Sequence, residues 1–234
     1  MSDHPESNKQ LQLHLAFVEM LFALAIGQVA VDVSRLIDYQ SMSHQAFWTV
    51  IPGYSHLLLS FVVISTSWVG WRTSRFCGTQ IKDVFTLNYI EFLTDIVLVV
   101  MYFTLARAVE IPDSPAKSLS PNASFEVRAV AVIITAYVFW DLISCRRNPR
   151  EKLTQRLWVS VSCTLISWIL VVLDIGQSGT VPAVLFADFC LIALILTFRA
   201  MKRRDLSKHD KKSWALILFM LFLVGIFLIG SLTC

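Results

Sequence analysis

Seven apolar stretches, separated by short polar or basic segments, dominate the pattern of the chain. Each stretch has 18 residues or more, and about 20 helical residues cross the ~30 Å hydrocarbon core of a bilayer. Since a backbone in lipid must satisfy its own hydrogen bonds, each stretch is expected to be a helix. The pattern therefore predicts an all-α, polytopic membrane helical bundle of seven transmembrane helices. The predicted spans are 15–36, 47–71, 85–106, 128–145, 157–174, 182–199 and 213–233.

The first and the last of these spans differ in polarity. The segment from Trp214 to Leu232 contains no charged residue. The first span is interrupted by Glu19, Gln28 and Asp32. Polar side chains at membrane depth face other protein segments or water, so the first helix is expected to turn a polar face away from lipid.

The basic residues predict the orientation of the bundle. Of the 20 Lys and Arg residues, all but four fall on the same side as the N-terminus. The four on the other side are Arg35, Arg107, Lys117 and Arg128. Cytoplasmic segments carry the excess of basic residues, so we expect the N-terminus in the cytoplasm and the C-terminus outside.

The chain is predicted to form one membrane domain over residues 15–234, behind a polar cytoplasmic N-terminus of residues 1–14. The longest loop, 108–127, contains three prolines and is expected to connect two spans without regular structure.

Composition agrees with a membrane protein and excludes other classes. The chain is 56% hydrophobic and 16% charged, against about 45–50% and about 25% in soluble domains. A net charge of +3 does not favour nucleic acid as a partner. The five cysteines show no C-x-x-C spacing, so neither a zinc site nor a disulfide framework is predicted. The basic cytoplasmic loops are candidate contacts for anionic lipid or a protein partner.

Three polar residues of the first span, Gln28, Asp32 and Arg35, fall in one row, and Glu19 lies on the opposite side of the helix. At 100° per residue, the members of this row lie within about 40° of Gln28. They are Phe17, Leu21, Leu24, Gln28, Asp32 and Arg35. Such a row could line an axial pathway. The alternative is that Asp32 and Arg35, three residues apart, pair with each other at the outer interface.

Four further acidic residues, Glu91, Asp95, Asp141 and Asp188, fall inside predicted spans and away from the last residue of each. Glu91 and Asp95 share one face of the third helix with Asn88. Two carboxylates this close in a low-dielectric setting need a shared proton, a bound cation or a basic partner. Asp141 falls in the cytoplasmic half, as Glu91 does, whereas Asp188 falls in the outer half with an open role.

Small polar rows on two other helices are interpreted as packing surfaces. His56, Ser60 and Ser67 share one face of the second helix, and Ser160 and Cys163 begin a similar row on the fifth. The chain lacks metalloprotease, Walker A, nucleophile-elbow and dinucleotide-binding motifs. No enzyme activity, cofactor or metal site is therefore predicted.

The first helices resemble a known channel family. The segment AFVEMLFALAI at 16–26 resembles the A-F-S-D-x-x-F-A-I-A-I signature of the FSD-motif potassium channels. SFVVISTSW at 60–68 is similar to the second-helix stretch of that family, and Asn88 to the asparagine that begins its third helix. The resemblance covers residues 13–106. Val18 and Glu19 depart from the signature, which has Ser and Asp there.

The resemblance implies a pore at the axis of an oligomer. Leu24 falls on the family's hydrophobic constriction, which opposes passage of a hydrated ion until it widens. Gln28 replaces a second apolar residue of that pore, so the resemblance implies a leakier or differently selective pathway. Leu21 and Asp32 would line the same pathway. The supporting residues behind the helix would be Phe17, Glu19, Trp68 and Asn88.

Three functions follow from these observations as hypotheses. The first is a homo-oligomeric, potassium-like channel, a tetramer or a dimer, that conducts monovalent cations across a bacterial inner (plasma) membrane. The second is a non-conducting membrane subunit or effector of a bacterial defence or envelope-stress system. The third is a proton-coupled carrier that uses Glu91 and Asp95.

Overall fold

A computed structural model describes most of the chain as long helices. It describes residues 5–43, 47–74, 86–112, 119–147, 153–173 and 180–202. The predicted span 213–233 and the basic segment before it lie outside the described residues. The helices are α1 (Pro5–Ser43), α2 (Phe47–Ser74), α3 (Leu87–Ala106), α4 (Ala123–Arg147), α5 (Leu153–Val172) and α6 (Val181–Lys202).

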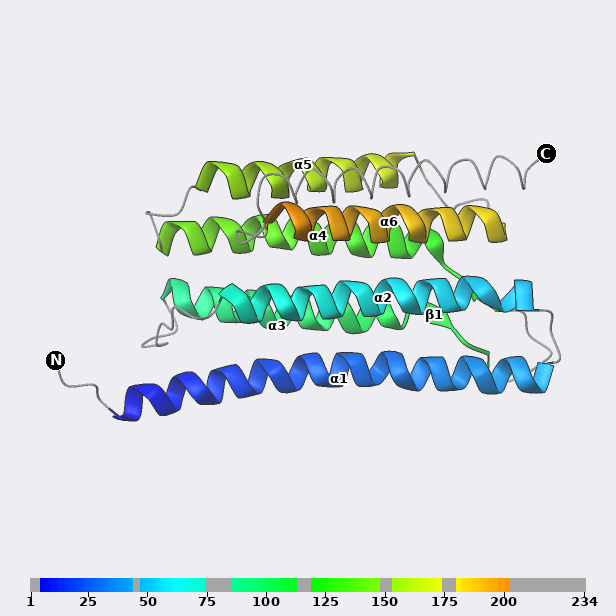
Figure 1. Ribbon diagram of the computed structural model, residues 1–234, viewed down its shortest axis with the longest axis horizontal. Coiled ribbons are helices and arrows are strands. Elements are labelled where there is room, and N and C mark those ends of the chain that lie inside the picture. The colour runs from blue at the N-terminus through cyan, green and yellow to red at the C-terminus, as the bar shows by residue number, and fades with distance from the viewer. Residues whose placement is uncertain are drawn as a thin grey trace.

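The six described helices lie side by side with nearly parallel axes (Figure 1). Helix α1 lies at one edge of the bundle and packs against α2 and α3. Helix α4 packs against α3, α5 and α6, and α6 also packs against α2. The interior between α2, α3, α4 and α6 is therefore enclosed by helices from both halves of the chain.

Four of these helices are long and apolar enough to cross a membrane. They are Ala16–Met42 within α1, Phe47–Arg72 within α2, Leu87–Ala106 and Val181–Lys202. Large apolar side chains are exposed around the bundle, among them Leu58, Val100, Phe139 and Leu165, each at 55% or more. A soluble monomer rarely exposes so much apolar surface, and these features match an integral membrane protein. The seventh span and the orientation of the termini remain predictions.

The connection between α3 and α4 carries regular structure that the sequence did not predict. Strands β1 (Val109–Glu110) and β2 (Ser120–Pro121) pair antiparallel, with Val109 opposite Pro121. Asn122 then caps α4, since its side-chain oxygen accepts the Phe125 N–H at 3.0 Å. The cap starts α4 at Ala123, five residues before the predicted span at 128. We call the end of the bundle that carries these strands the hairpin end.

The core combines apolar packing with many buried polar groups. Helix α1 contributes one stripe to it, formed by Val18, Phe22, Ala25, Val29, Asp32, Leu36 and Tyr39. Between the inner helices, His56, Glu91, Asp95, Glu126, Asp141 and Asp188 are all buried. Buried ionisable groups within membrane helices are rare and mark functional sites, so they define where function is sought.

Candidate functional site

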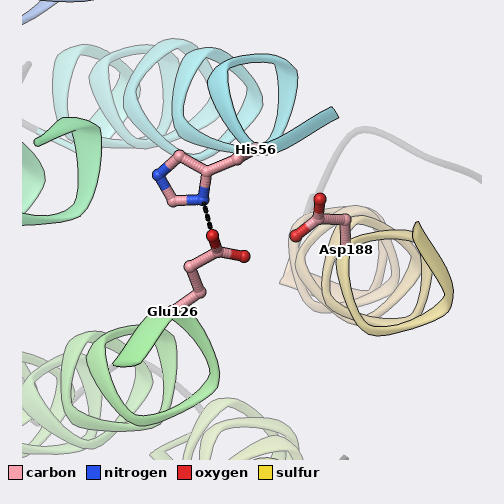
Figure 2. A group of neighbouring side chains, drawn as sticks. All are labelled: His56, Glu126 and Asp188. Carbon is pink, nitrogen blue, oxygen red and sulfur yellow. Dashed lines mark ion pairs between the residues drawn. The ribbon is translucent and has the colours of Figure 1, made fainter. Parts of the chain in front are cut away.

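Three ionisable side chains from three helices meet inside the hairpin end of the bundle. His56 lies on α2, Glu126 on α4 and Asp188 on α6, and their side chains point toward one another (Figure 2). One ligand atom from each lies within 4.8 Å of the other two. Their relative exposures are 0%, 0% and 1%. We call this group the His56–Glu126–Asp188 triad.

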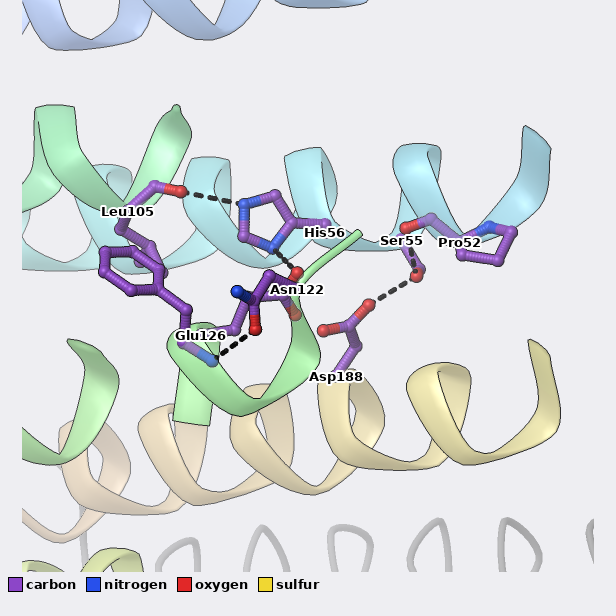
Figure 3. A network of polar contacts seen from close by, with 8 residues as sticks. Pro52, Ser55, His56, Leu105, Asn122, Glu126 and Asp188 are labelled. Atoms are coloured by element: carbon purple, nitrogen blue, oxygen red, sulfur yellow. Dashed lines mark hydrogen bonds and ion pairs between the residues drawn. The ribbon is translucent and has the colours of Figure 1, made fainter. Parts of the chain in front are cut away.

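The orientation of His56 is fixed by a backbone carbonyl. The Nε2 atom lies 2.8 Å from the Leu105 carbonyl oxygen (Figure 3). Leu105 is near the C-terminus of α3, where carbonyls lack an intrahelical partner. A carbonyl only accepts hydrogen bonds, so Nε2 carries a hydrogen and donates it. In the neutral imidazole, Nδ1 is then a free acceptor.

Nδ1 of His56 points at Glu126. It lies 2.6 Å from Oε1 of that carboxyl group. Glu126 occupies the first turn of α4, where the helix dipole stabilises a negative charge. A neutral imidazole nitrogen and a carboxylate oxygen both present lone pairs, so this contact requires a shared proton or a bound cation. The carboxyl group of Glu126 also lies beside that of Asp188, and no hydroxyl, amide or indole of the described residues donates a hydrogen bond to it.

Asp188 completes the triad with one oxygen held and one free. The Ser55 hydroxyl donates to Oδ2 of Asp188, and the Pro52 carbonyl lies 3.0 Å from the same hydroxyl. Oδ1 of Asp188 has no hydrogen-bond partner among the described residues. The triad thus presents Nδ1, Oδ1 and the Glu126 oxygens to a common space, and this arrangement can bind a cation or exchange a proton.

The predicted row of α1 is divided between the interior and the surface. Asp32 is buried at 5% exposure, accepts a hydrogen bond from Gln28 Nε2 at 2.9 Å and lies 3.9 Å from Arg35. The alternative that Asp32 pairs with Arg35 is therefore what the structure contains. Its negative charge also acts on His56. Asp32 thus belongs to the protomer interior near the triad.

The rest of that row lies toward the surface of the protomer. Leu24 is 54% exposed and Phe17 is 40% exposed, whereas Leu21 and Gln28 are partly buried. At 100° per residue, the predicted row is offset by about 80° from the buried stripe of α1. Leu24 therefore faces lipid or a neighbouring molecule rather than the interior of its own bundle.

The residues predicted to support α1 lie in different surroundings. Glu19 is exposed, while Trp68 is partly buried and packs against the core. The Arg72 guanidinium lies 5.4 Å from the centre of the Trp68 ring. Asn88 is partly buried, and Phe17 contacts Phe92 at a ring separation of 6.1 Å. The supporting role of these residues remains a prediction.

The other predicted acids, Glu91, Asp95 and Asp141, interact with other residues and lie farther from the hairpin end than the triad does. Asp95 accepts hydrogen bonds from the indole N–H groups of Trp71 at 3.0 Å and Trp140 at 3.1 Å. Asp141 pairs with Lys202 at 2.5 Å. Glu91 is buried at 1% exposure. Asp95 and Asp141 thus have the partners expected of structural anchors, and a carrier site at Glu91 and Asp95 remains a hypothesis.

A cluster of three hydroxyl groups, from Ser67, Tyr102 and Tyr137, surrounds Arg199 inside the bundle. Nη2 of Arg199 donates to the Tyr137 hydroxyl at 2.6 Å and to Ser67 at 3.0 Å. Tyr102 shares a hydrogen bond of 2.6 Å with the same Tyr137 hydroxyl. The guanidinium carbon lies 4.7 Å from the centre of the Tyr137 ring, which is a cation–π distance. The positive charge of Arg199, a partly buried residue in the last turn of α6, is thereby held among these hydroxyl groups.

Sequence reasoning named Asp188 but did not predict the triad. Its members are about 60 to 70 positions apart and come from three helices, so no local motif connects them. His56 and Ser60 were interpreted as packing residues, and Glu126 fell before the predicted start of its span. No family model, curated protein or solved structure matches the chain. A function is therefore inferred from the geometry of the site alone.

Proposed function

We propose that this protein is a carrier-type membrane transporter that binds a cation inside its own helix bundle at the His56–Glu126–Asp188 triad. The observation that supports this proposal is the meeting of three fully buried ionisable residues, in which Nδ1 of His56 faces Oε1 of Glu126 and Oδ1 of Asp188 has no hydrogen-bond partner among the described residues. Burying an unpaired carboxylate costs several kcal/mol or more. Such groups persist at membrane depth where they bind ions or relay protons.

The surroundings of the triad favour a carrier over an open pore. On α2, His56 and Ser60 continue toward Ser67, and all three side chains are buried. The row then meets Arg199, whose positive charge opposes the passage of a cation. Alternating access requires a binding site that is open to one side of the membrane while it is closed to the other. The cation would enter from the hairpin end.

Flux measurements test this proposal. The purified protein is placed in vesicles that report uptake of H⁺, K⁺ or Zn²⁺, and the variants are Glu126→Gln and Asp188→Asn. Uptake of the transported cation should fall to the level of protein-free vesicles in both. Glu110→Gln removes an exposed carboxylate at the same end of the bundle and should transport normally. Uptake that is equal in all four proteins would contradict a carrier site at the triad.

A pore lined by α1 is the second candidate function. It is supported by the exposure of Leu24 and by the partial exposure of Gln28 on a face that the protomer leaves uncovered. In a homo-oligomer these side chains could surround an axis, as the channel-like signature of α1 implies. Asp32 would not join them, because it is buried within the protomer.

Particle symmetry and flux distinguish the pore from the carrier. A pore requires a twofold or fourfold particle with α1 innermost, and Leu24→Ala should raise monovalent cation flux. Gln28→Leu should lower it. Ile37→Ala is the matched control, since Ile37 is 50% exposed and lies about 140° away around α1. A monomeric particle whose cation flux is unchanged by Leu24→Ala argues against the pore.

We further propose that the protein is located in the cell membrane of a bacterium.

A further inference from the structure

We infer that the His56–Glu126–Asp188 triad binds a divalent transition-metal ion of the Zn²⁺, Mn²⁺ or Fe²⁺ class. This inference rests on the proposed cation carrier and narrows its ligand. The set of donor atoms gives the first reason. Alkali ions, Mg²⁺ and Ca²⁺ are bound by oxygen ligands, whereas an imidazole nitrogen together with carboxylates suits first-row transition metals.

Charge balance gives the second reason. A neutral His56 and two carboxylates carry a net charge of −2, which a divalent ion cancels. A monovalent ion would leave one uncompensated negative charge in a site where all three side chains are at most 1% exposed. A dry site therefore favours the divalent ion.

The surrounding hydrogen bonds give the third reason. A histidine that ligates a metal usually donates its other ring N–H to a backbone carbonyl or carboxylate, which fixes the tautomer and the ring orientation. His56 makes this bond through Nε2 to the Leu105 carbonyl, so its other ring nitrogen, Nδ1, faces the site and can bind the ion. Asp188 is held in the same way through Oδ2 by Ser55, with Oδ1 left over. Each ligand is thus oriented by a group outside the site.

Distances show how an ion would fit. Ligand bonds of about 2.0–2.1 Å at a tetrahedral ion separate neighbouring ligand atoms by about 3.3 Å. The contact between His56 Nδ1 and Glu126 Oε1, now 2.6 Å, would have to widen to about 3.3 Å. The ligand atoms of all three residues already lie within 4.8 Å of one another. Three protein ligands leave a fourth position open. An open position lets an ion be exchanged, as transport requires.

Metal binding to the purified full-length protein tests the inference without measuring transport. After treatment with a chelator, calorimetry with Zn²⁺ should show one site per chain, and Ca²⁺, Mg²⁺ and K⁺ should bind at least 100-fold more weakly. Glu126→Gln, Asp188→Asn and His56→Gln should each weaken Zn²⁺ binding at least 100-fold. Ser55→Ala, which removes only an orienting bond, should weaken it about 10- to 100-fold. Glu110→Gln should bind as the unaltered protein does.

A spectroscopic measurement on the unaltered protein removes the dependence on variants that fail to fold. Zinc X-ray absorption should show nitrogen and oxygen neighbours with the multiple scattering of one imidazole. Sulfur scattering, which would place the ion at one of the five cysteines, would overturn the inference. Absence of a stoichiometric Zn²⁺ site would overturn it too, and a triad-dependent H⁺ or K⁺ flux would then leave the carrier proposal intact. Stoichiometric zinc without any flux would support the site and reject the carrier.

Discussion

The hydroxyl of Tyr137 connects α4 to three other helices, α2, α3 and α6, and its removal has a calculable cost. Tyr137→Phe deletes one oxygen atom and keeps the ring, which packs against Phe198 at a centroid separation of 5.3 Å. The oxygen accepts a hydrogen bond from Arg199 and also bonds Tyr102 and Ser67. The substitution therefore changes hydrogen bonding with little change in packing.

The magnitude follows from the partners that remain. A hydrogen bond to a charged group is worth about 1.5–3 kcal/mol, and a buried hydroxyl that loses its partner costs about 1–3 kcal/mol. Arg199 keeps its bond to Ser67, and Ser67 keeps its bond to the Val63 carbonyl. A net loss of about 2–4 kcal/mol in the free energy of unfolding is expected. For a chain of this size that corresponds to a fall in Tm of about 4–16 °C.

Thermal unfolding in a mild detergent, followed by circular dichroism, measures this effect. The matched control is Tyr54→Phe, which removes a single neutral hydrogen bond of 2.9 Å to Gln40 and should cost about 0.5–1.5 kcal/mol. A double-mutant cycle of Tyr137→Phe with Ser67→Ala should show coupling of about 0.5 kcal/mol or more. Additive effects, or a smaller loss at Tyr137 than at Tyr54, would refute the reasoning that the cluster acts as a unit.

Three further predictions concern packing, charge and orientation. A methyl group at Gly70 would come within 2.3 Å of a guanidinium nitrogen of Arg199, so Gly70→Ala should lower Tm by several degrees. Gly27→Ala is the control and should leave Tm unchanged, because no atom lies within 4 Å of the added methyl group. Lys202→Met leaves the buried Asp141 unpaired and should destabilise by about 3–5 kcal/mol; adding Asp141→Asn should restore much of the loss, and a double variant as unstable as the single one would contradict this. Glu110→Cys, in a cysteine-free background, should react with an impermeant maleimide added to intact cells, and protection from it would reverse the predicted orientation.

The sequence predicts the helices well because their signal is local. Four predicted spans agree with helices long and apolar enough to cross a membrane. A fifth lies within α4, and a sixth overlaps α5, which ends at Val172. Hydrophobic length is a property of consecutive residues. The start of α4 was misjudged because an asparagine cap, and not an apolar residue, begins the helix.

The site was only partly predictable, for a different reason. Asp188 is conspicuous as an acid in an apolar span, but its neighbours Ser55 and Glu126 depend on which helices pack together. Helical periodicity identifies the face that a residue occupies and not the helix it meets. For the same reason Asp95 appeared unsatisfied, although two tryptophans from other helices donate to it.

The short hairpin between α3 and α4 has a mechanical consequence. Leu105, which sets the ring of His56, lies just before β1, and Glu126 lies just after β2. The pairing of Val109 with Pro121 ties these two points together. A displacement of the hairpin would therefore disturb a nitrogen donor and an oxygen donor in one concerted motion. His56 and Glu126 would then loosen together, whereas Asp188, which comes from α6 and is held by Ser55 of α2, would stay in place.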